Sequence, residues 1–167
     1  MAKHLRPLHT SPMSAPLHPA SVDDHSTLLA LIAEYFAYDE IPFEPESVAK
    51  GLDQLLLDPS LGRTFLIKSG SEVAGYLILT FGFDLEVGGR LGLLTDLYLR
   101  PAWRRQGLGS RALEALFDQS RALGLHAIEL QAERDNSEAR AFYAKMGFAA
   151  FDRIPLCKRL SPPGISR

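Results

Sequence analysis

The 167-residue chain has one cysteine, Cys157, so it lacks the residues for an internal disulfide or a multi-cysteine zinc site. Its five histidines show no pairing at helical spacing and no clustering with carboxylates, and we therefore expect no metal site. A lone cysteine fits a reducing compartment, which favours a cytoplasmic location. We interpret Cys157 itself as a small buried hydrophobic residue near the end of the chain.

The sequence also has no long apolar run and little net charge. A membrane-spanning helix needs about 20 consecutive apolar residues, and no stretch approaches that length. The first twenty residues contain basic groups but no apolar core of a signal peptide. A formal net charge of -2 argues against a nucleic-acid-binding surface, which usually carries a surplus of Lys and Arg. We expect neither a membrane nor a nucleic acid as a partner.

What the chain does have is an ordinary globular composition, with 46% hydrophobic and 23% charged residues. Its length favours one domain over two. Residues 1–15 contain Pro, Ser and His without periodicity, which is typical of a flexible tail. We therefore expect a single domain over residues 16–161 and a short C-terminal tail over residues 162–167.

The order of helical and strand patterns predicts an α+β fold with a mixed, mainly antiparallel central sheet flanked by helices. In chain order the expected elements are helices over about 23–39 and 44–58, strands over 63–69, 73–83 and 91–99, a helix over 108–123, a strand over 126–133, a helix over 136–147, and a weaker strand over 148–160. Parallel pairing is expected only at the central strand, helix, strand crossover.

Arginines and glycines are concentrated in the connection after the strand over 91–99, in the stretch "LRPAWRRQGLGSRAL". The first N–H groups of a helix have no intrahelical partner, and the peptide dipoles make that end positive. Gly107 and Gly109 leave the backbone bare, while the arginines raise the local potential. This pattern favours a diphosphate site, and the alternative is a tight, solvated connection. It is neither a P-loop nor a dinucleotide-binding fingerprint.

The spacing of Arg104, Gly107 and Gly109 resembles the Arg/Gln-x-x-Gly-x-Gly/Ala acyl-CoA-binding motif of the GNAT superfamily of N-acetyltransferases. A second stretch, "ERDNSEARAFYAKMGF", resembles the later acyl-CoA and catalytic segment of that family. The order of elements also matches over about residues 17–160. The resemblance implies a GNAT-like α+β fold whose central parallel strands splay apart. It also implies acetyl-CoA as cosubstrate and no metal.

The resemblance implies a set of cofactor-binding residues around the glycine turn and in the second motif. In that family, the backbone before the turn binds the pantetheine arm and the thioester carbonyl, and the N–H groups of the turn bind the diphosphate. The corresponding residues here are Leu97, Tyr98, Leu99, Arg104, Arg105, Gln106, Gly107, Leu108, Gly109, Ser110, Asn136 and Tyr143. Strand alternation further predicts that Leu94, Asp96 and Tyr98 share one face, with Tyr98 lining the cleft.

Two residues are candidates for catalysis by the same resemblance. Tyr143 lies where the family commonly carries the tyrosine that protonates the coenzyme A sulfur, although it could instead be a partly buried packing aromatic. Asp96 lies where some members carry a glutamate that deprotonates the amine, and it could instead bind substrate or hold a loop. Asn136 is either a pantetheine contact or the N-cap of its helix.

The sequence indicates less about the acceptor of the acetyl group. Asp39, Glu40 and Glu86 lie in acidic loops that could attract a cationic amine, or they could be ordinary solvated charges. We hypothesise direct transfer of acetyl from acetyl-CoA to a primary amine, of a small molecule, through a ternary complex. The alternatives are a noncatalytic acyl-CoA sensor that binds a partner, and a peptide or protein N-acetyltransferase. Both a homodimer and a monomer are compatible with the sequence.

Overall fold

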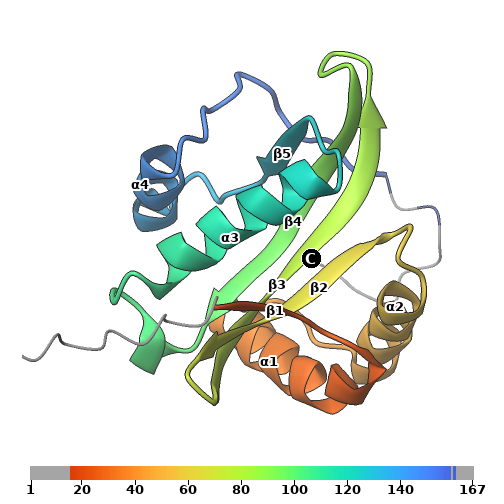
Figure 1. The fold of residues 1–167 in the computed structure, drawn as a ribbon, viewed down its shortest axis with the longest axis vertical. Coiled ribbons are helices and arrows are strands. Elements are labelled where there is room, and N and C mark those ends of the chain that lie inside the picture. The colour runs from red at the N-terminus through yellow and green to blue at the C-terminus, as the bar shows by residue number, and fades with distance from the viewer. Residues whose placement is uncertain (1–15, 159, 161–167) are drawn as a thin grey trace, which may run out of the picture.

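The computed structural model describes residues 16–158 and 160, so the predicted tails at 1–15 and 162–167 lie outside the described residues. The described residues form a five-stranded sheet in the order β1-β2-β3-β4-β5 (Figure 1). Its strands are β1 (Leu17–Pro19), β2 (Gly62–Ser69), β3 (Glu72–Asp84), β4 (Gly89–Leu99) and β5 (Ala127–Leu130). All neighbours pair antiparallel except β4 and β5, which pair parallel. The predicted mixed α+β class is confirmed.

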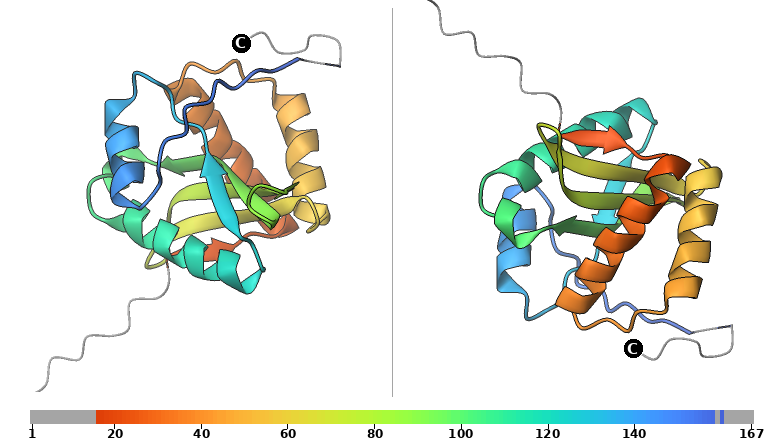
Figure 2. Two further views of the ribbon diagram at one scale, coloured as in Figure 1. Left: turned by 90° about the horizontal axis from the view of Figure 1, so that it is seen from above. Right: turned by 90° about the horizontal axis from the view of Figure 1, so that it is seen from below.

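The helices begin where the sequence supplies start signals. The described segments are η1 (Val22–Asp24), α1 (His25–Tyr38), α2 (Pro45–Leu57), η2 (Pro101–Trp103), α3 (Leu108–Ala122) and α4 (Ser137–Lys145). Ser21 and Asp24 form a capping box before α1, and Pro45 takes the first turn of α2, where no N–H bond is lost. Figure 2 shows α1 and α2 on one face of the sheet and α3 with α4 on the other.

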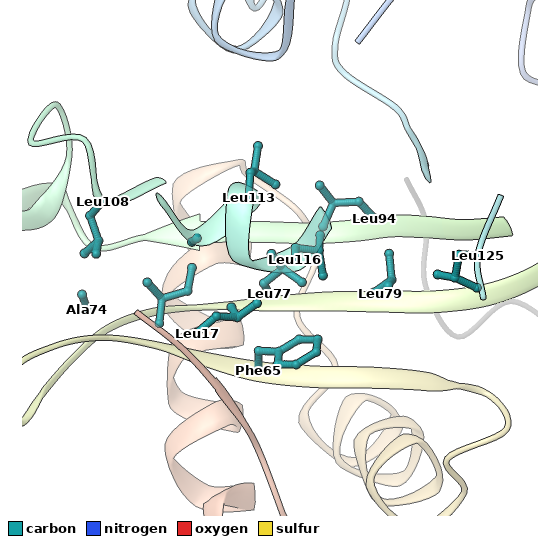
Figure 3. Close-up of a cluster of buried hydrophobic side chains, with 12 residues drawn as sticks. Leu17, Phe65, Ala74, Leu77, Leu79, Leu94, Leu108, Leu113, Leu116 and Leu125 are labelled. Atoms are coloured by element: carbon teal, nitrogen blue, oxygen red, sulfur yellow. The ribbon is translucent and has the colours of Figure 1, made fainter. Parts of the chain in front are cut away.

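Each face of the sheet buries its own apolar core. On the α3 side, leucines of β3, β4 and α3 pack with Phe65 of β2, as Figure 3 shows. On the other side, Leu28, Leu31 and Ile32 of α1 pack against Tyr76 of β3 and Tyr98 of β4. Both faces of the central strands are therefore covered, which explains why β3 is an almost continuous apolar run.

The ladder between β3 and β4 contains an irregularity that changes which side chains share a face. Ile78 pairs with Asp96 and Leu79 pairs with Leu94, so Thr95 is an extra residue, as in a β-bulge. Leu94 consequently packs in the core under α3, whereas Tyr98 packs in the core under α1. The prediction that Leu94, Asp96 and Tyr98 share one face is wrong, because simple alternation does not hold across the bulge.

The chain differs from the sequence prediction at both ends of the described part. The short strand β1 was not expected, since three residues carry too little pattern to detect. The strand expected over 148–160 is not formed by the described residues of that segment, and Pro155 there cannot donate to a ladder. Ile154 and Leu156 are exposed, and so is Cys157, contrary to its interpretation as a buried residue.

Candidate functional site

The parallel pair β4–β5 is short, and β4 continues beyond it. The pairing ends where Leu94 meets Leu130, while β3 stays paired with β4 as far as Leu99. The N–H of Arg100 donates to the carbonyl of Ala74 at 2.9 Å, toward β3. Because successive residues of a strand turn their N–H and C=O groups to opposite edges, Leu99 and Leu97 turn theirs away from β3, past the end of the β5 ladder.

The turn between β4 and α3 contains two residues with positive φ angles. Arg105 has φ 59° and Gly107 has φ 75°, in the left-handed region. Gly107 is the N-cap of α3, and no side-chain hydrogen bond of the described residues caps this helix. The N–H groups of the first turn of α3 therefore have no partner from a capping side chain. Such a helix start binds anions through its N–H groups and the helix dipole.

The two glycines of the turn are not required by crowding inside the protein. A Cβ placed on Gly107 would meet no atom within 4 Å, and one on Gly109 would make ordinary contacts of 3.5 Å with Leu99 and Phe142. The backbone of the turn is thus left uncovered by side chains at these two positions, as the predicted diphosphate site requires. Buried Leu108 anchors the turn from below.

The side chains of the turn bind within the protein. The Nε of Arg104 donates to the carbonyl of Leu99 at 2.7 Å, and its guanidinium lies over the ring of Tyr38 at 4.2 Å. Arg105 pairs with Glu138 of α4 at 3.0 Å, and Gln106 donates to the carbonyl of Ala102. These bonds hold the turn against its neighbours, so the side chains of Arg104, Arg105 and Gln106 are engaged within the protein.

Tyr143 of α4 packs against two aromatic rings in the core on the α3 side. Its ring centroid lies 5.3 Å from that of Phe142 and 5.7 Å from that of Phe148. Burial raises the pKa of Tyr143 to about 12, so its hydroxyl keeps its proton at neutral pH. The packing that we gave as the alternative role is present, and the same packing leaves a protonated hydroxyl suited to general acid chemistry.

Asp96 faces the α1 side of the sheet at the bulge. The Oγ1 of Thr95 donates to its carboxylate at a long 3.4 Å. Asp96 also lines a cavity of about 210 Å³ between α1, α2 and the sheet. Its charge raises the pKa of Tyr35 on α1 and of Tyr76 on β3, although burial is the larger cause for both.

Both catalytic candidates contribute to the raised pKa of Tyr35 on α1. After burial, the causes that raise its pKa include the carboxylates of Asp39 and Asp96 and the phenol of Tyr143. Electrostatic influence from α4, from β4 and from the end of α1 thus converges on one hydroxyl.

The remaining sequence candidates are spread over the fold. Asn136 caps α4, its Oδ1 accepting from the N–H of Ala139 at 2.9 Å, which is the helix-cap alternative. Asp39 and Glu40 follow α1. Glu86 lies in the turn before β4, where Arg153 contacts it at 2.6 Å. The eleven residues of β4 therefore separate Glu86 from the end of the strand where the turn and Asp96 lie, and the acidic loops do not form one cluster.

Sequence reasoning missed two tyrosines that border the candidate site, Tyr35 and Tyr76. Tyr76 is fully buried, and its hydroxyl has no hydrogen-bond partner among the described residues. Ring centroids place Tyr35 6.4 Å from Tyr76 and 5.8 Å from Tyr98. Tyr35 continues the helical spacing after Ile32, a signal that could have found it. Tyr76 sits inside a continuous apolar strand, where no pattern marks a hydroxyl.

Two absences concern the described part of the chain. Residues 16–158 and 160 contain no group of three or more His, Cys, Asp or Glu side chains that could hold a metal ion. No helix within these ranges is long and apolar enough to cross a membrane.

Comparison with known proteins gives the site a context. An integron cassette protein from the mobile metagenome of Cole Harbour salt marsh superposes with a TM-score of 0.80 at 30% identity, covering 93% of this chain and 97% of that one. A predicted acetyltransferase of Clostridium acetobutylicum, solved with acetyl-CoA, superposes with a TM-score of 0.72 at 19% identity, covering 85% and 94%.

Sequence comparison agrees with the fold. An L-methionine sulfoximine/L-methionine sulfone acetyltransferase of Pseudomonas aeruginosa is 25% identical over 146 residues, which span 86% of this chain and 85% of that protein. The model of the acetyltransferase (GNAT) family matches residues 28–148, a range that includes the glycine turn, Asp96 and Tyr143. The chain therefore belongs to the acetyltransferase (GNAT) family.

Proposed function

We propose that this acetyltransferase transfers acetyl from acetyl-CoA directly to the primary amine of a small molecule, through a ternary complex. The observation that carries the proposal is the uncapped start of α3 beside the end of β4, where pairing with β5 has stopped. The GNAT family uses acetyl-CoA as cosubstrate. The Pseudomonas relative is named for two small molecules, which supports a small acceptor. We assign the activity to one domain over residues 16–161.

The chain would hold the cosubstrate with its backbone. The N–H groups from Arg105 to Ser110 would bind the diphosphate, and those of Leu97 and Leu99 would bind the pantetheine arm or polarise the thioester carbonyl. The carbonyl of Leu99 already accepts from Arg104, so the N–H is the group that Leu99 offers. Acetyl-CoA supplies an acetyl group activated as a thioester. We propose that Tyr98 and Arg104 position this backbone and that Asn136 positions the start of α4, the helix that carries Tyr143.

Two side chains would move protons during the transfer. An amine attacks only in its neutral form, and Asp96 would accept its proton directly or through a water as the N–C bond forms. Tyr143 would donate its proton to the sulfur as the C–S bond breaks. Its raised pKa, about 12, keeps that proton in place until the thiolate forms. The acetylated amine and coenzyme A thiol are the products; Asp96 then releases its proton to solvent, and Tyr143 takes up a proton from solvent.

The arrangement of the two faces supports a ternary complex. The cavity beside Asp96 lies on the α1 side of the sheet, whereas the glycine turn leads into α3 on the other side. Donor and acceptor can therefore bind together and meet at the end of β4, without a covalent acetyl-enzyme step. We propose the cytoplasm as the location, since an exposed thiol at Cys157 suits a reducing compartment.

The test is a thiol-release assay with acetyl-CoA over a panel of amines, followed by initial rates at varied concentrations of both substrates. We expect amine-dependent release of coenzyme A and double-reciprocal lines that intersect. Parallel lines would contradict the ternary complex. Binding of acetyl-CoA without release by any amine in a panel of polyamines, aminoglycosides, amino acids, simple alkylamines and peptides would contradict the enzymatic proposal and favour a sensor.

A further inference from the structure

The cavity beside Asp96 has a composition that bears on the acceptor. It has a volume of about 210 Å³ and lies between α1, α2 and the face of β3 and β4. Its apolar lining consists of Ile32, Phe36, Val48, Leu52, Leu55 and Ile78. Apart from one glycine and two threonines, the remaining lining residue is Asp96, which carries the one charge. The lining formed by the described residues contains no Lys, Arg or His.

The two threonines add little polarity to the cavity. The Oγ1 of Thr80 contacts the carbonyl of Leu93 at 3.4 Å, and that of Thr95 contacts the carbonyl of Ile78 at the same distance. The hydroxyl of Thr80 is therefore turned toward the backbone of the sheet, and that of Thr95 lies between this backbone and the carboxylate of Asp96. The space presents an apolar wall with a single carboxylate at its β4 end, and this asymmetry gives a ligand one polar end and one apolar end.

We propose that the acceptor is a primary amine whose nitrogen meets Asp96 and whose other end is a compact apolar group without a carboxylate. This inference rests on the proposed function. A protein cavity of about 150 Å³ lined by apolar side chains holds a benzene ring. A cavity of about 210 Å³ thus accommodates a phenyl or branched alkyl group with a short linker to the nitrogen.

The same lining disfavours two other kinds of amine. An amino acid would bring its α-carboxylate close to Asp96, with no cation of the lining to offset the repulsion. A polyamine or aminoglycoside would place further ammonium groups against apolar walls, where a charge without a partner is poorly tolerated. The inferred class therefore differs from the substrates in the name of the Pseudomonas relative, which are amino acids.

Matched pairs of amines test the inference. 2-Phenylethylamine and phenylalanine differ only in the carboxylate, as do 3-methylbutylamine and leucine, and ethylamine supplies the nitrogen without the apolar group. We expect kcat/KM for each apolar amine to exceed that of its amino acid and of ethylamine by at least about tenfold. Equal or higher values for the amino acids, for ethylamine or for spermidine would overturn this inference while leaving the acetyltransferase proposal intact. Release with none of these amines would overturn this inference, and the acetyltransferase proposal fails with it only if the aminoglycosides and peptides of the wider panel also give no release.

A variant that narrows the cavity gives an independent test. Gly51 lies on α2 at the cavity, and a Cβ built there meets no atom within 4 Å. Gly51→Leu therefore puts bulk into open space and also favours the helix, so the protein should fold. We expect KM for 2-phenylethylamine to rise at least about tenfold, with ethylamine little affected.

The matched control is Gln54→Leu, an exposed position of the same helix outside the lining. It adds the same side chain to α2 and should leave both amines unchanged. Thermal unfolding of both variants verifies that they fold. Equal effects of the two substitutions on 2-phenylethylamine, or an equal effect of Gly51→Leu on ethylamine, would show that the apolar group does not occupy this cavity.

Discussion

In the proposed mechanism, Tyr143 serves packing and chemistry together. Its ring is fixed between Phe142 and Phe148, and the same enclosure that holds the ring raises the pKa of the hydroxyl to about 12. A phenol of ordinary pKa, about 10, would begin to lose its proton in mildly alkaline solution. Tyr143 stays protonated there, so its capacity to donate extends over the range in which amines become neutral.

Replacing Tyr143 with Phe removes the proton donor and keeps the ring in the core. We expect kcat to fall by about 10² to 10⁴ and the Kd for acetyl-CoA to change little. Steady-state rates and isothermal titration with acetyl-CoA measure both quantities. Tyr38→Phe is the control, because Tyr38 is an exposed tyrosine whose ring contacts Arg104 and whose hydroxyl has no role in the proposal. Full turnover by Tyr143→Phe at every pH would exclude the acid role.

Replacing Asp96 with Asn tests the base. We expect kcat/KM to fall by about 10² to 10³, because the amine must then lose its proton to solvent. The remaining rate should rise about tenfold per pH unit below the pKa of the amine. A pH–rate profile measures this dependence, and Asp118→Asn on the exposed surface of α3 is the control. A higher KM with unchanged kcat and unchanged pH profile would instead assign Asp96 to substrate binding.

At the scale of an element, the start of α3 combines left-handed backbone with a helix end that no side chain caps. Gly107→Ala puts a Cβ on a residue with φ 75°, which costs about 1 to 2 kcal/mol and disturbs the N–H groups of the turn. We expect the Kd for acetyl-CoA to rise at least about tenfold, as measured by calorimetry.

Gly70→Ala is the matched control for that substitution. Gly70 has φ 62° in the turn between β2 and β3, and an added Cβ there also meets nothing within 4 Å. Both variants should lose similar stability in chemical unfolding, and Gly107→Ala alone should weaken acetyl-CoA binding. If the two variants bind acetyl-CoA equally well, the turn does not hold the diphosphate.

The elements with strong hydrophobic periodicity were predictable from the sequence. The features that depend on pairing with another strand or packing against another helix were not. The helices α1, α2 and α3 followed from their apolar stripes, and Gly107 and Gly109 identified the turn before α3. The bulge at Thr95 was not predictable, because an extra residue in a ladder depends on the register with β3. For the same reason the sequence could not show that Asp96 borders a cavity.

At the scale of the molecule, buried tyrosine hydroxyls make the free energy of unfolding decrease at alkaline pH. Burial raises the pKa of Tyr35, Tyr76 and Tyr143 above their ordinary value. In the unfolded chain these tyrosines titrate near pH 10. The stabilisation is complete below about pH 10, and it is lost above that value because the unfolded chain then releases protons that the folded protein retains.

We therefore expect the free energy of unfolding to decrease as pH rises from 10 to 12, as urea unfolding at a series of pH values would measure. Tyr76→Phe should make this decrease smaller and should raise stability at pH 7, since the buried hydroxyl of Tyr76 has no hydrogen-bond partner among the described residues. Tyr38→Phe should alter neither quantity as much. An unchanged slope for Tyr76→Phe would show that this phenol does not cause the alkaline loss of stability.

The bulge at Thr95 also reverses which side chains of β4, those with even or those with odd residue numbers, face the α3 side of the sheet. Before it, Leu94 and the backbone of Gly92 face the core under α3, and after it Leu97 and Leu99 do. On that face, the positions that must remain apolar thus have even residue numbers before the bulge and odd residue numbers after it. A saturation-mutagenesis scan of β4 should show this phase change directly, and a homologue that lacks one residue at Thr95 could keep both cores with a regular ladder.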